Sequence, residues 1–214
     1  MLFNPHHYDA SEFDAETRRL LRATIDFFEG QGKKRILDDD LRAQWPADFV
    51  EFVKREKLFA TFLTPSEFAD GNPPDKRWDG ARNAALAEIL GFYGLTYWYT
   101  EQVTILGLGP VWQSENKDAK LRAADDLEAG EVMAFGLSER EHGADVYSTD
   151  MVLTPASEED VANGILYRAS GGRSTTSATA TSRAWSRSSV GAATSRDTTG
   201  TCSSPPTAVT RTTT

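Results

Sequence analysis

The chain changes character near residue 172, and this break limits the part of the molecule that can fold. Residues 173–214 contain 22 serines or threonines among 42 residues, and Trp185 is their only large apolar side chain. A segment with so little apolar surface cannot offset the conformational entropy that it loses on folding. The sequence therefore predicts a folded body over residues 1–172 and a disordered Ser/Thr-rich tail over residues 173–214.

Two origins of this tail stay open: a native disordered linker, and a frameshift near Gly172 that translates the wrong reading frame. We favour the frameshift, because codons can be chosen for residues 174–181 and 199–214 so that one shifted frame gives strand-like sequence in both. A mucin-like stalk would need a secreted protein. The first seven residues have neither the basic nor the apolar region of a secretion signal, which argues against one.

Charge and composition exclude several classes of protein. Residues 1–172 hold 31 acids and 18 bases, and such an acidic body argues against nucleic-acid binding, which needs clustered Lys and Arg. The single cysteine, Cys202, excludes an internal disulfide and a multi-cysteine metal site. The longest apolar-rich stretch, residues 84–108, contains Glu88 and Glu101 and several glycines, so no membrane span is expected. We expect a cytoplasmic protein.

Helical spacing of apolar residues predicts an all-α region up to about residue 130. The expected helices run from Ser11 or Asp14 to about Glu29, from Pro46 to Leu63, from Gly80 to Leu106, and from Ser114 to Gly130. Apolar side chains surround the third of these on all sides, which predicts a central, enclosed helix that ends at the Gly107–Pro110 turn. Residues 33–35 (Lys-Lys-Arg) are expected on a solvated face or in a loop.

After Gly130 the pattern changes to short apolar runs, which are typical of strands. The runs are residues 132–137, 147–153 and 165–169. The predicted fold class is therefore mainly α, with a short β segment over residues 131–172.

One block of sequence is specific enough to suggest a family. Gly130-Glu131 forms a predicted turn, and residues 135–145 then read FGLSEREHGAD. This block, preceded by about four helices, resembles the acyl-CoA dehydrogenase family where its N-terminal helical domain meets its middle β domain. The resemblance covers residues 14–172 and is strongest over residues 106–146. It implies an N-terminal α-helical domain over residues 1–130 and a partial middle β domain over residues 131–172.

The resemblance also implies an FAD site and a substrate contact. Phe135 and Leu137 would lie along the flavin through their backbones, and Ser138 would place its hydroxyl near the reactive edge of the isoalloxazine ring. Gly143 has no side chain, so the main chain there can approach a ligand closely. Ala144 occupies a position that is commonly Ser in the family and contacts the acyl-CoA, so the missing hydroxyl leaves the acyl preference open.

Simpler interpretations stand beside these. Ser138 could cap a turn, and Phe135 could be an ordinary core residue. His142 is expected on a loop surface, and Asp145 is expected to hold the loop together. Gly107-Leu108-Gly109 lacks the third glycine of a dinucleotide fingerprint and follows a helix, which excludes a Rossmann loop. The aromatic side chains of residues 93 and 97–99 have helical spacing and are expected in the core.

The activity implied by the family is oxidation of the Cα–Cβ bond of an acyl-CoA thioester, with electrons passed from FAD to an electron-transfer flavoprotein. An acyl-CoA oxidase would share this half of the sequence. The family's carboxylate base lies in a C-terminal helical domain, so no catalytic residue is assigned here, neither Glu88 and Glu101 nor Glu139 and Glu141. The chain itself is expected to be inactive and at best a weak FAD binder, and the intact parent is expected to be a homo-oligomer.

The alternative is a non-catalytic helical binding or interaction module with a disordered tail.

Overall fold

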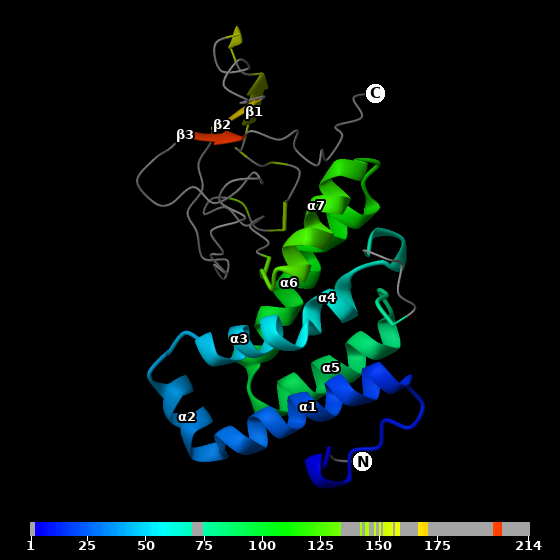
Figure 1. Cartoon of the computed structure of the whole chain (residues 1–214). Helices are drawn as coiled ribbons and strands as arrows, with labels where there is room; N and C mark the ends of the chain where they lie inside the picture. Colours follow the sequence, from blue (N-terminus) through cyan, green and yellow to red (C-terminus); the bar gives the residue numbers. More distant parts are fainter. Residues whose placement is uncertain are drawn as a thin grey trace. The chain divides into compact units, whose positions relative to one another are not determined.

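In the residues that it describes, the computed structural model is mainly helical, with three short strands (Figure 1). The chain divides into two units. The first unit consists of residues 1–105 and 118–132, and the second consists of residues 106–117 and 133–214. The residues that the structure describes are 3–69, 75–133, 142, 144–145, 148, 150, 152–155, 157–158, 167–170 and 199–202.

Helix α1 (Ala15–Gln31) confirms the first predicted helix. The carboxylate of Asp14 accepts a hydrogen bond from the backbone N–H of Thr17 at 2.9 Å, so Asp14 and not Ser11 is the N-cap. Gly30 lies inside the helix, and Gly32, with φ of 81°, ends it. The predicted inner face is buried and consists of Leu20, Leu21, Thr24, Ile25 and Phe28, together with Thr17.

Helix α2 (Lys33–Leu41) begins directly after Gly32, where a solvated face or loop is predicted. Ile36 is its only buried residue, so the expectation of a solvated face is confirmed. The sequence gives little sign of a helix here because one buried position in nine residues sets no periodicity.

The predicted helix from Pro46 to Leu63 is two helices, α3 (Ala47–Glu56) and α4 (Leu58–Leu63). Lys57 separates them in the left-handed conformation, with φ of 57°. The Nζ atom of Lys57 donates a hydrogen bond to the carbonyl oxygen of Glu128 and lies 3.5 Å from its carboxylate. These contacts hold the bend at Lys57 against the C-terminal end of the helix that contains Glu128.

The predicted helix from Gly80 to Leu106 is also interrupted. Helix α5 (Gly80–Tyr93) ends at Gly94, whose N–H bonds to the carbonyl of Leu90, and helix α6 (Leu95–Gln113) starts after it. The prediction that Gly107–Pro110 ends the helix is wrong, because α6 continues through Pro110. Proline removes one backbone donor, and the helix tolerates this loss here.

The prediction that residues 80–106 are enclosed on all sides is also wrong. Leu95 is 72% exposed, and Phe92, Tyr99 and Leu106 are also exposed. Apolar residues on every side of a helix are therefore not enough to bury that helix in this chain.

The core of the first unit is rich in aromatic residues. Phe28 of α1 stacks on Tyr93 of α5, with ring centroids 4.6 Å apart, and on Phe49 of α3, at 5.8 Å. Phe27 stacks on Phe52 at 4.6 Å. Helices α1 and α5 lie side by side (Figure 1), which brings these rings together. Tyr93 and Tyr97 join this aromatic cluster and are half-buried, since Tyr97 meets the rings of Phe28 and Phe49. The prediction of a core position is wrong for Tyr99, which is 43% exposed.

Helix α7 (Lys117–Glu128) confirms the fourth predicted helix and ends before Gly130. Gly130 has φ of 83°, and a Cβ atom there would overlap the side chain and Cα of Lys54. Only glycine fits this turn, because both the backbone conformation and the space exclude a side chain.

Three strands form an antiparallel sheet in the order β1-β2-β3. Strand β1 (Val152–Pro155) pairs with β2 (Tyr167–Ser170), and β2 pairs with β3 (Thr199–Cys202). The first two overlap the strands predicted at 147–153 and 165–169. The predicted strand at 132–137 begins with two residues outside any strand, and its remainder lies outside the described residues. Strand β3 falls in the tail, which differs from the expectation of a tail without ordered elements.

Within the described part of the chain, every helix is too short or too polar to cross a membrane.

Candidate functional site

Most of the predicted flavin site lies outside the described residues. This applies to Phe135, Leu137, Ser138 and Gly143, so their assignment stays a prediction. Ala144, the predicted acyl-CoA contact, is described and is exposed in a bend.

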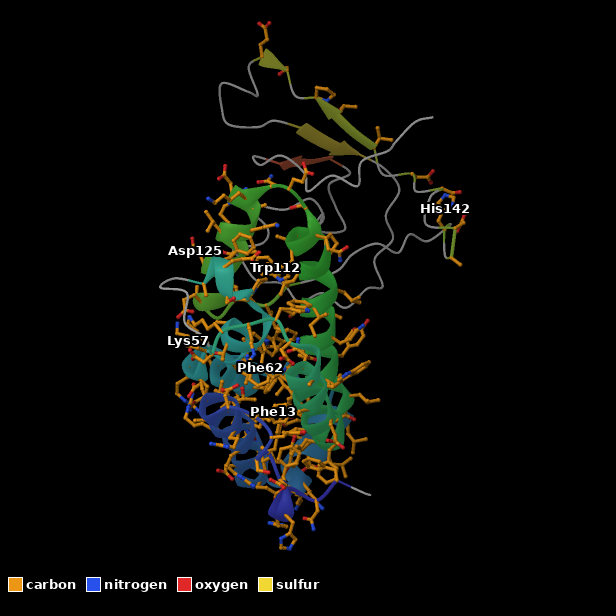
Figure 2. The ribbon with its side chains drawn as sticks, turned by 90° about the vertical axis from the view of Figure 1, so that its right-hand side faces the viewer. Phe13, Lys57, Phe62, Trp112, Asp125 and His142 are labelled. Carbon is orange, nitrogen blue, oxygen red and sulfur yellow. The ribbon has the colours of Figure 1, made fainter. Side chains whose placement is uncertain are left out.

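The residues that flank Ala144 form a small polar cluster, in which Figure 2 labels His142. Nδ1 of His142 lies 2.8 Å from Oδ2 of Asp145, and its Nε2 lies 3.6 Å from Oδ1 of Asp150. The backbone N–H of Ser148 donates to the carbonyl of Asp145 at 2.8 Å. The hydrogen bond with Asp145 raises the pKa of His142. Asp145 thus joins two points of the loop, which agrees with its predicted structural role.

A buried carboxyl group lies in α6. Glu101 is 1% exposed, and its Oε1 has no hydrogen-bond partner among the described residues. Burial raises the pKa of Glu101 to about 8, so the carboxyl carries its proton at neutral pH. Its neighbours Thr100 and Thr104 turn their hydroxyls to the backbone carbonyls of the preceding turn, at 2.9 and 2.8 Å.

Such a protonated acid in an apolar setting is able to donate a hydrogen bond or a proton. Sequence reasoning does not assign Glu101 a role. The available signal is its position inside a long apolar run.

A buried guanidinium lies at the start of α5. Arg82 is fully buried, and its guanidinium lies 4.7 Å from the ring centroid of Phe62. The Phe62 side chain lies in the interior of the helical unit (Figure 2). The Nη1 atom of Arg82 donates to the carbonyl of Arg77 at 3.4 Å, while Nε and Nη2 have no hydrogen-bond partner in the described part of the chain. Burial lowers the pKa of Arg82. Because Arg82 is closed off from solvent, we assign it to the core and not to a ligand.

A cleft of 680 Å³ opens in the first unit, a volume within the range of small-molecule sites. Its lining combines apolar, mostly aromatic, side chains with charged ones. Arg35 of the lining bonds to Asp48 and lies 3.6 Å from Asp39. The lining includes Phe27, Trp45, Phe49, Phe92, Tyr93, Leu95 and Tyr97, together with Lys33, Arg35, Asp39, Asp40 and Asp48. No residue of the predicted FAD site belongs to it.

Among the described side chains there is no group of three or more His, Cys, Asp or Glu residues placed to hold a metal ion. Comparison with protein-family models and with curated proteins finds no match for this chain.

Proposed function

We propose that the chain is the N-terminal part of an FAD-dependent acyl-CoA dehydrogenase, whose parent enzyme oxidises the Cα–Cβ bond of an acyl-CoA thioester. The observation that carries the proposal is the block from Gly130 to Asp145 and its place in the chain. The block follows seven α-helices and precedes two antiparallel strands, β1 and β2. This order of helices, turn and strands supports the proposal, because the resemblance predicts the same order.

The proposed chemistry divides between the flavin and the protein. Bound FAD would accept the substrate's β-hydride and pass electrons on to an electron-transfer flavoprotein. Ser138 would donate a hydrogen bond to the flavin, and Gly143 would let the backbone approach it. Ala144 would lie against the acyl-CoA. The contact of the His142 side chain with the Asp145 carboxylate, at 2.8 Å, supports this arrangement because it links residues on either side of Ala144.

We expect the purified chain to bind FAD weakly and to show no turnover, because the resemblance carries no position for the carboxylate base. Titration of FAD with the full chain, followed by flavin fluorescence, should give saturable quenching. Gly143→Val should abolish that quenching by blocking close approach of the backbone, and Ser138→Ala should weaken it.

Ser114→Ala is the matched control, because the Ser114 hydroxyl donates to the carbonyl of Val111 at 2.8 Å, in the turn after α6. This variant should bind FAD as the wild type does. Quenching that is non-saturable, or that is equal in all three variants, would contradict the proposed site.

The second candidate is a non-catalytic helical interaction module. The observation that favours it is the set of large apolar side chains exposed around the cleft, namely Leu37, Leu41, Trp45, Phe92 and Leu95. Exposed apolar surface of this kind marks interaction sites.

A further inference from the structure

Helix α2 contributes little to the core of its own chain. It lies between α1 and α3 at one edge of the helical unit (Figure 1), and Ile36 is its only buried residue. Leu37 is 57% exposed and Leu41 is 75% exposed. Residues four apart lie on the same face of a helix, so these two leucines form an exposed apolar strip along α2, which begins at the cleft that Leu37 helps to line.

The charges of α2 are separated along its length. Lys33, Lys34 and Arg35 occupy its first turn, and Asp38 and the two following aspartates occupy its last turns. This order opposes the helix dipole, which favours acids at the N-terminus and bases at the C-terminus. The pattern therefore does not stabilise the isolated helix.

Intramolecular pairing accounts for only part of these charges. Arg35 pairs with Asp39 and Asp48. Lys33, Lys34, Asp38 and Asp40 form no ion pair with any described residue. Four charged side chains thus remain without an ion pair beside the apolar strip, and of these Asp40 accepts a hydrogen bond from the Thr96 hydroxyl at 3.4 Å.

We propose that the outer face of α2 is a self-association surface, on which α2 of a second copy of this chain packs antiparallel. A twofold axis near Leu37 places Lys33 opposite Asp40 of the second copy and Lys34 opposite Asp38 of the second copy. By symmetry the same pairs form a second time, and the apolar strips meet between them. A twofold interface requires a surface that is complementary to itself, and the charge order of α2 meets this requirement.

The same order decides the direction of pairing and the kind of partner. Parallel packing would bring the lysines of both copies together and the aspartates together, which costs binding energy. A uniformly acidic or basic partner would meet one matching and one opposing end. Trp45 and Leu95 are exposed beside the strip and extend its apolar area. A single short helix gives a small interface, so the dimer belongs at the weak end of protein association.

Charge reversal tests the pairing. In the full chain, Lys33→Glu with Lys34→Glu leaves Arg35 as the one basic residue of an acidic α2, and Asp38→Lys with Asp40→Lys leaves Asp39 as the one acidic residue of a basic α2. Sedimentation equilibrium should show a dissociation constant about tenfold or more weaker for each variant alone than for the wild type. An equimolar mixture of the two variants should recover association, because the acidic and basic helices now complement each other.

The control is Arg18→Glu with Lys117→Glu, which changes the net charge by the same amount as the Lys33/Lys34 variant, at exposed positions outside α2. This variant should associate as the wild type does. A wild-type chain that stays monomeric at the highest soluble concentration would overturn the proposal. So would variants that associate unchanged, or variants whose mixture gives no recovery.

A cross-link covers the case in which a charge-reversed variant fails to fold. In a chain carrying Cys202→Ser, Leu37→Cys should give a covalent dimer with a short thiol cross-linker, because Leu37 lies next to the proposed axis. The matched position is Leu121→Cys on α7, which is exposed to a similar degree, at 41%, and should give none. Equal cross-linking at the two positions, or none at Leu37, would overturn the proposal.

Discussion

Replacing Glu101 with Gln is expected to remove most of the pH dependence of stability between pH 5 and pH 8. Burial raises the pKa of this carboxyl from 4.5 to about 8. Above pH 4.5 the unfolded chain ionises Glu101, while the folded chain keeps the proton until about pH 8. The stabilising contribution is therefore complete below pH 4.5, falls as the pH rises, and is lost above pH 8. At about 1.4 kcal/mol for each pKa unit, the wild type should lose about 5 kcal/mol across this window.

Urea unfolding at a series of pH values, followed by circular dichroism, measures this effect. Asp126→Asn is the comparison variant, because burial also raises the pKa of Asp126, which is only half-buried. Acids with lowered pKa values, such as Glu16 with its hydrogen bond from Arg19, titrate below this window and leave it unaffected. The account is contradicted if Glu101→Gln shows the same slope with pH as the wild type.

Phe28→Ala is expected to lower the free energy of unfolding by about 3–5 kcal/mol. Phe28 is 1% exposed, and its ring meets Phe49, Tyr93 and Tyr97 from three other helices. Removing it leaves a cavity that these rigid rings fill poorly.

Thermal unfolding of Phe28→Ala and of Phe92→Ala measures the loss of unfolding free energy in each variant. Phe92 lies on α5 and is 43% exposed, so its loss should cost much less. Equal losses for the two variants would show that the aromatic cluster around Phe28 does not hold the helices together.

The helices that could be predicted from the sequence are those with both a cap and a repeated buried face. Helix α1 has Asp14 at its start and a regular buried stripe, and its bounds agree with the prediction to within about two residues. Helix α2 was not predicted because it packs through Ile36 alone.

The breaks at Lys57 and Gly94 were also missed. Lysine rarely adopts a positive φ, and the apolar spacing continues across both positions. The error at Pro110 is the opposite one. The sequence predicts a helix end there, and α6 continues through Pro110.

The buried ionisable groups could not be predicted in the same way. Glu101 and Arg82 occur in sequence surroundings that also fit exposed positions, and only the packing of several helices closes over them. The FAD contacts proposed for Phe135, Leu137 and Ser138 depend on one short motif.

The most direct test of the proposed family is the nucleotide sequence across codons 165–214, translated in all three frames. The proposal predicts that a shifted frame continues from near Gly172 into further strands and a helical domain that contains a carboxylate base. If every other frame closes within a few codons, the Ser/Thr tail is native. That result would contradict the account of a frameshifted acyl-CoA dehydrogenase and would favour the interaction module.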